Sequence, residues 1–260
     1  MAHPSYLALV ADLDDSRQLA AEARSQVQRS LLELSRKSQS WLGALPVAGP
    51  EVVSGDRMQA LFPCPARRSE AERVAAAIAD TVLLWAAEAR RVSEGEAAFS
   101  FGLGCGSLST AIDADRIGRM DGPCFHRAET ALVEDAKRGK RFCGARGFGP
   151  PAGAAQSEEV LGADRALAGS FEAIGALIQS WTARQTEFVL ATHRRGVLRV
   201  QAGELRFAPQ LSRTEVATRF GVGLPTVSKS LASAQAHALP GVMYAAAWQL
   251  ASIIERTVRP

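Results

Sequence analysis

Apolar residues recur at helical spacing in two long segments of the first half of the chain. In residues 16–42 they follow one another at spacings of four, four and three, and they are Ala23, Val27, Leu31 and Leu34. Residues 68–92 carry a similar stripe that includes Ile78 and Trp85. Because this spacing places the apolar side chains on one face of a helix, both segments are predicted as amphipathic helices.

Shorter apolar runs between these segments predict strands. Residues 6–12 form one, residues 51–62 read as a hairpin around a Ser-Gly-Asp turn, and residues 98–106 form a glycine-rich third strand. A third helix is expected to start near Pro123, because proline is tolerated in a first helical turn. With a last strand at 141–143, the order predicts an α+β fold with helices on one face of a mainly antiparallel sheet.

The second half of the chain has a different character. Residues 144–160 are rich in Gly, Pro and Ala and have no period, which is typical of a linker. Beyond them, residues 165–192 are mostly helical in pattern, 197–207 resemble a hairpin, and 243–254 form an apolar final helix suited to packing or dimerisation. We therefore expect three parts, which are a domain at 1–145, a linker at 146–164 and an all-α domain at 165–260.

Residues 211–231 have the pattern of a helix-turn-helix. Ser212 and Glu215 stand three apart, as in a capping box, and Gly221 lies where the turn needs a positive φ. Pro225 opens the second helix, whose first turn would enter the major groove of DNA. The alternative is two short helices that only pack a small helical domain. Candidate DNA contacts are Arg213, Arg219, Pro225, Thr226, Ser228 and Lys229.

Composition agrees with a globular protein but hides an asymmetry of charge. The 260 residues are 47% hydrophobic and 22% charged, with a net charge of +3. Residues 181–260 hold ten Lys and Arg against four Asp and Glu, which is +6, whereas residues 1–180 hold twenty against twenty-three, which is −3. A basic tail favours a polyanion partner such as double-stranded DNA.

No apolar run is long enough for a membrane span and no signal peptide is evident, so we expect a cytoplasmic protein without a membrane partner. Four widely spaced cysteines without a CxxC pair favour reduced thiols over a disulfide set or a zinc site.

Two carboxylates sit where strand ends are expected. Asp12 ends the first strand and Asp56 lies in the hairpin turn. Carboxylates at adjacent strand ends can share Mg²⁺ or Mn²⁺, which suits chemistry on nucleotide phosphates. The alternative is that both only occupy a strand end and a turn.

Several motifs along the chain resemble the SatD family. They are VADLDDSR at 10–17, SGDRMQALF at 54–62, MDGPCFHRAETAL at 120–132 and SWTARQ at 180–185. The N-terminal part is also distantly similar to the catalytic domain of class III nucleotidyl cyclases, a ferredoxin-like palm. That resemblance implies that Asp12 and Asp56 are metal ligands, with the Leu13 carbonyl as a third. It also implies that the domain pairs as a homodimer.

The chain departs from the cyclase pattern at several positions. Asp15, Ser16 and Arg17 replace the family's Gly-Phe-Thr phosphate cradle, His126 takes the asparagine position, and Thr130 takes that of the transition-state arginine. Arg127 lies beside them. We expect Leu13, these three substituted loop residues, His126 and Arg127 to contact a ligand.

Losing the arginine removes charge stabilisation from phosphoryl chemistry. The first hypothesis is therefore a DNA-binding transcriptional regulator whose degenerate cyclase-like domain senses a nucleotide or cyclic nucleotide and catalyses no reaction. The alternative is an active metal-dependent nucleotidyl cyclase with an appended DNA-binding domain. A third interpretation is a protein whose domains serve only assembly.

Overall fold

The computed structural model describes residues 4–14, 20–95, 97–148, 158–193, 198–201, 204–207 and 211–258. Its centre is a five-stranded sheet in the order β2-β3-β1-β4-β5. The strands are β1 (Tyr6–Leu13), β2 (Ala48–Ser54), β3 (Arg57–Pro63), β4 (Phe99–Gly106) and β5 (Cys143–Arg146). Neighbours run antiparallel except β4 and β5, which are parallel, so the α+β class and the mainly antiparallel sheet are confirmed.

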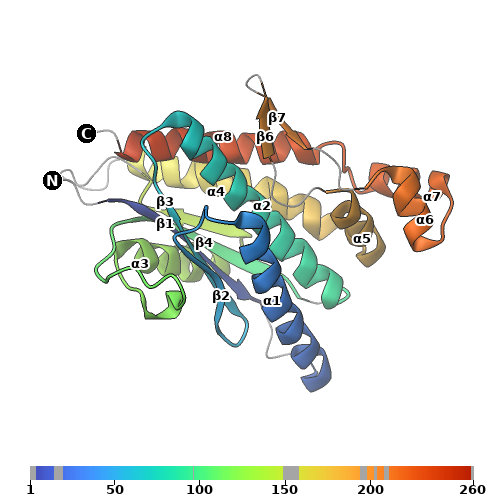
Figure 1. Ribbon diagram of the computed structural model, residues 1–260, viewed down its shortest axis with the longest axis horizontal. Coiled ribbons are helices and arrows are strands. Elements are labelled where there is room, and N and C mark those ends of the chain that lie inside the picture. Colours follow the sequence, from blue (N-terminus) through green and yellow to red (C-terminus); the bar gives the residue numbers. More distant parts are fainter. Residues whose placement is uncertain are drawn as a thin grey trace.

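Helices cover both faces of this sheet, and the expectation of helices on one face was wrong. Helices α1 (Ala21–Leu42) and α2 (Arg68–Val92) pack on the face that carries Leu9 and Phe101. Helix α3 (Pro123–Thr130) packs on the opposite face, over Ala8 and Val10 of β1. Figure 1 shows α3 separated from α1 and α2 by the sheet.

The glycines of β4 explain how the second face accepts a helix. Gly102, Gly104 and Gly106 alternate along the strand, so all three point toward α3. A Cβ atom added to Gly104 would lie 2.2 Å from both the Ala128 nitrogen and the Cys124 carbonyl oxygen. The strand and the helix therefore meet backbone to backbone, which only glycine permits.

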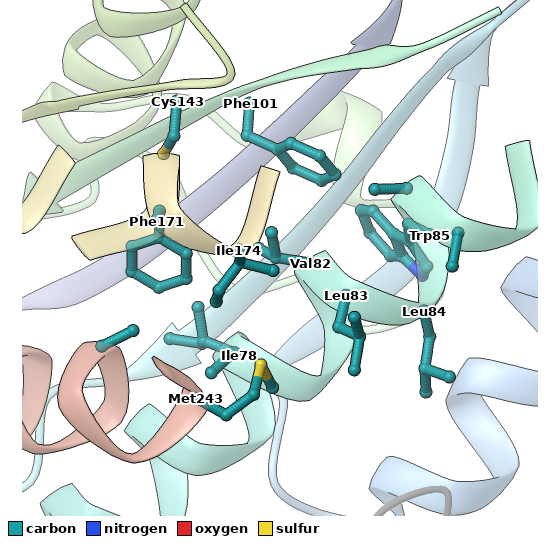
Figure 2. Close-up of a cluster of buried hydrophobic side chains, with 14 of the residues drawn as sticks. Ile78, Val82, Leu83, Leu84, Trp85, Phe101, Cys143, Phe171, Ile174 and Met243 are labelled. Carbon is teal, nitrogen blue, oxygen red and sulfur yellow. The ribbon is translucent and has the colours of Figure 1, made fainter. Parts of the chain in front are cut away.

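The C-terminal helices extend the core of the sheet. Helix α4 (Glu158–Ser180) packs on β5, and α8 (Leu239–Val258) runs along both α2 and α4 (Figure 1). Figure 2 shows the result, with side chains from these helices and from the sheet converging on one cluster. They include Ile78 of α2, Phe101 of β4, Phe171 and Ile174 of α4, and Met243 of α8.

The helices between α4 and α8 lie toward one end of the molecule, and a small hairpin lies against α2 and α8 (Figure 1). Helix α5 (Ala183–Thr192) packs on α2, and the strands β6 (Leu198–Gln201) and β7 (Glu204–Phe207) form the expected hairpin. Because this hairpin lies within 165–260, the expectation of an all-α part there was wrong. Helix α6 (Arg213–Phe220) and helix α7 (Leu224–Ser233) project at that end (Figure 1).

The predicted linker at 146–164 overlaps with secondary structure at both of its ends. Strand β5 reaches Arg146, and α4 already begins at Glu158, inside the segment that composition assigned to the linker. The helices beyond it share one apolar cluster with the sheet. The division into domains at 1–145 and 165–260 stays a prediction.

All four cysteines are free thiols. In the part of the chain that the structure describes, no helix is long and apolar enough to cross a bilayer.

Candidate functional site

The fold brings the two predicted carboxylate positions to one end of the sheet. Asp12 in β1 lies opposite Arg57 in β3, and Asp56 directly precedes Arg57 in the hairpin turn. Gly55 in this turn has a φ of +55°, the left-handed conformation that glycine tolerates best. The hairpin pattern thus placed Asp56 beside the end of β1, as predicted.

Two cationic side chains contact the Asp12 carboxylate. Lys137 donates a hydrogen bond to one Asp12 oxygen, and Arg57 Nε lies 3.5 Å from the other. Arg57 also donates through Nη1 to both oxygens of Glu129, at 3.0 and 3.1 Å. Ser100 donates to Asp14 at 2.6 Å, and Lys137 is 3.5 Å from the same carboxyl group. We call Asp12, Asp14, Arg57, Glu129 and Lys137 the strand-end cluster.

Burial and charge shift two protonation equilibria in this cluster. Burial raises the pKa of Asp14, although the Ser100 hydrogen bond and the Lys137 charge lower it in part. For Lys137, burial lowers the pKa, but the hydrogen bond and charge of Asp12, together with Asp14, outweigh burial and raise it overall. Lys137 is therefore held as a cation between two carboxyl groups.

This arrangement was tested against the metal site that Asp12 and Asp56 were expected to form. A divalent cation needs carboxylate oxygens that face open space or water. Both Asp12 oxygens instead lie against Lys137 and Arg57, so the residues as placed do not fit a metal ion. Binding of Mg²⁺ or Mn²⁺ at this place would require both cationic side chains to move, and it stays a prediction.

Sequence reasoning missed Lys137, and the structure shows why. It lies 125 residues from Asp12 and is carried by η2 (Ala131–Lys137), a π-helical continuation of α3. π-Helical turns are rare and concentrate at functional sites. The only signal in the sequence was that Lys137 is one of four lysines in a chain whose other basic residues are arginines.

The structure separates His126 and Arg127 from Asp12. Arg127 donates through Nη1 to the Cys105 carbonyl at 2.6 Å, and Cys105 lies opposite Leu7 in the sheet. Leu7 is five residues from Asp12, which corresponds to about 16 Å along a strand.

His126 is exposed and lies 3.0 Å from Asp121, near the start of α3. Of the predicted ligand residues that the structure describes, only Leu13 in β1 therefore lies beside the strand-end cluster. Asp15, Ser16 and Arg17 lie outside the described residues.

Thr130, at the expected arginine position, donates its hydroxyl to the His126 carbonyl at 2.7 Å. This is an internal helix hydrogen bond, and it brings no positive charge to the end of α3.

The predicted helix pair forms as its local signals indicated. Ser212 caps α6, and its side chain and that of Glu215 make the two reciprocal hydrogen bonds of a capping box. Gly221 ends α6 with a φ of +62°, and Pro225 lies in the first turn of α7. Val216 and Val227 are fully buried between the helices and the body.

Most of the candidate DNA contacts are exposed on this pair. They are Arg213, Arg219, Pro225, Thr226 and Lys229. Ser228 differs because it is half-buried. Ser228 and Arg213 both line a cavity on the side of the pair that faces α5 and α8.

Comparison of the chain with protein-family models and with curated proteins finds no match. The resemblance to the SatD family and to nucleotidyl cyclases therefore rests on the quoted motifs alone.

Proposed function

We propose that this chain is a DNA-binding transcriptional regulator of the SatD type. In this proposal the helix pair α6–α7 reads DNA, and the cyclase-like N-terminal region senses a nucleotide or cyclic nucleotide. The observation that carries the proposal is the capped, exposed helix pair at one end of the molecule (Figure 1). Its exposed side chains include a threonine and three basic residues, the types that contact bases and phosphates.

The charge of the described helix pair supports the same proposal. Arg213, Arg219 and Lys229 are exposed, while Glu215 is the one acidic residue in 211–233. Glu215 accepts the backbone N–H of Ser212 at 2.6 Å, so its carboxylate is held at the N-terminus of α6. The surface beyond that cap is therefore positive, which favours phosphate contacts that release counterions.

In the proposed regulator, the N-terminal region senses its ligand without turning it over. Thr130 supplies no positive charge where a cyclase would use an arginine, and Asp12 is compensated by Lys137 and Arg57. A homodimer would present two helix pairs to one duplex. Trp248 on α8 keeps 52% of its surface exposed and is a candidate part of that interface.

The DNA-binding part is tested by fluorescence anisotropy with a short mixed-sequence duplex over a range of salt concentrations. We expect Lys229→Ala and Arg219→Ala each to weaken binding and to reduce the salt slope by about one. Arg67→Ala is the matched control, since Arg67 is 82% exposed at the start of α2, far from the helix pair along the chain. Unchanged affinity and slope in both test variants would overturn the proposal.

The second candidate function is an active metal-dependent nucleotidyl cyclase. The position of Asp12 and Asp56 at neighbouring strand ends favours it, although Lys137 and Arg57 would have to move away from Asp12 before a metal ion could bind. Product formation from ATP or GTP with Mg²⁺ or Mn²⁺, abolished by Asp56→Ala, would establish turnover. Thermal stabilisation by a nucleotide without turnover would support the sensor instead.

A further inference from the structure

A cavity of about 380 Å³ lies where the helix pair meets the rest of the molecule. Its walls come from the end of α5, the start of α6, one side of α7 and the segment that leads into α8. The volume falls in the range of small-molecule sites in proteins.

The lining of this cavity combines apolar side chains with basic ones. Val189, Leu231 and Leu239 contribute apolar walls, and all three are buried residues of the core. Arg213, His193 and His237 add a guanidinium and two imidazoles. Among the described residues that line the cavity there is no aspartate or glutamate. Two carboxylates contact the lining from outside, Asp80 at His193 and Glu215 at the Ser212 nitrogen. The lining itself offers the Arg213 guanidinium beside apolar walls, which favours a ligand with a negatively charged group and an apolar body.

One of the two imidazole rings is fixed by a contact with a residue outside the cavity lining. His193 Nε2 lies 2.7 Å from Asp80 Oδ1 of α2, and both side chains are almost completely buried. The Asp80 contact fixes the orientation of the His193 ring, which forms part of the cavity wall, and a rigid wall reduces the entropy lost on binding. Ser228 of α7 adds a half-buried hydroxyl on the opposite wall.

We propose that this cavity is a binding site for an amphipathic organic anion, with an apolar body of one or two rings and a single carboxylate, sulfonate or phosphate group. The apolar body packs against Val189, Leu231 and Leu239, and the anionic group pairs with Arg213 and His237. This site is distinct from the strand-end cluster, which lies at the end of β1 and not at the helix pair.

The position of the cavity would let a bound ligand change the DNA affinity of the helix pair, a point that rests on the proposed DNA-binding function. Arg213 and Ser228 belong to α6 and α7, whereas Val189 and His193 belong to the α5 region that packs on α2. A ligand that touches both sets shifts the orientation of the helix pair if it prefers one arrangement. Arg213 cannot pair with the bound anion and with a DNA phosphate through the same N–H groups.

The site is tested without DNA, so that its failure is separate from failure of the DNA-binding proposal. The full chain is titrated with 8-anilinonaphthalene-1-sulfonate, an aromatic anion of suitable size, and fluorescence reports binding. N-phenyl-1-naphthylamine, which has the same rings but no charge, is titrated in parallel. We expect one saturable sulfonate site per chain and at least fivefold weaker binding of the neutral compound.

Two matched variants locate the site on α7. Ala232 and its neighbour Ser233 are both exposed, but Ala232 lines the cavity and Ser233 does not. We expect Ala232→Phe to weaken sulfonate binding at least tenfold and Ser233→Phe to leave it unchanged, with circular dichroism confirming that both fold.

Arg213→Gln tests the site if the larger side chain at position 232 disturbs folding. Arg213 is exposed, so the substitution should leave the fold intact and remove most of the preference for the anion. Equal binding by the two phenylalanine variants, or equal affinity for the charged and neutral compounds, would overturn the proposal.

Discussion

Strand β4 and helix α3 meet backbone to backbone, and Gly104→Ala tests this contact directly. The new Cβ atom would lie 2.2 Å from two backbone atoms of α3 and 2.8 Å from the Ala128 Cα. Real Cβ contacts stay above 3.0 Å, so the helix must retreat by about 0.8 Å, the difference between 3.0 and 2.2. Retreat separates Phe125 and Leu132 from Val10 and Leu61 in the second apolar cluster.

We expect Gly104→Ala to lower the free energy of unfolding by about 3 kcal/mol, the upper end of the cost of overpacking a core. For a chain of this size this corresponds to a fall in Tm of roughly 6–12 °C. The obstructing atoms belong to the backbone of α3, so adding Ala128→Gly should not restore stability. Urea unfolding followed by circular dichroism measures both variants.

Gly169→Ala is the matched control. Gly169 lies inside α4, is exposed, and has no atom within 4 Å of an added Cβ. There the substitution should stabilise the protein by about 0.5–1 kcal/mol, because alanine favours the helix. If Gly104→Ala changed stability as little as Gly169→Ala does, the backbone-to-backbone contact described for β4 and α3 would be refuted.

Two further predictions concern buried charge. His193→Ala removes the 2.7 Å contact with the buried Asp80 and should lower the free energy of unfolding by about 3 kcal/mol. Lys37→Ala, at an exposed ion pair, should lower it by less than about 1 kcal/mol. Similar urea midpoints for the two variants would contradict this prediction. Because burial raises the pKa of Asp14, the folded state keeps this proton to a higher pH than the unfolded chain, and ionisation of Asp14 costs stability as pH rises. Unfolding measured from about pH 4 to pH 7 should therefore show Asp14→Asn gaining stability relative to the unaltered protein as pH increases, and a difference independent of pH would show that burial does not govern this group.

The features that the sequence alone predicted well depend on residues close together in the chain. Residues 68–92 form α2 over the predicted range because a 3.6-residue apolar period is a property of one helix. The capping box of Ser212 and Glu215 and the left-handed Gly221 depend on hydrogen bonds that span five residues or fewer. The hairpin turn at Gly55 and Asp56 is equally local.

Only the tertiary structure decided which groups from distant parts of the chain meet. Nothing in the pattern near residue 12 indicated that Lys137 would compensate Asp12, because that contact depends on the path of α3 across the second face of the sheet. The same path places Arg127 beside Cys105, far from the cluster that contains Asp12. The cavity between α5 and the helix pair also has no sequence signature, since its walls come from separate helices. Helix and turn signals are carried by hydrogen bonds within a few residues, whereas a binding site depends on packing between elements that the chain brings together only when it folds.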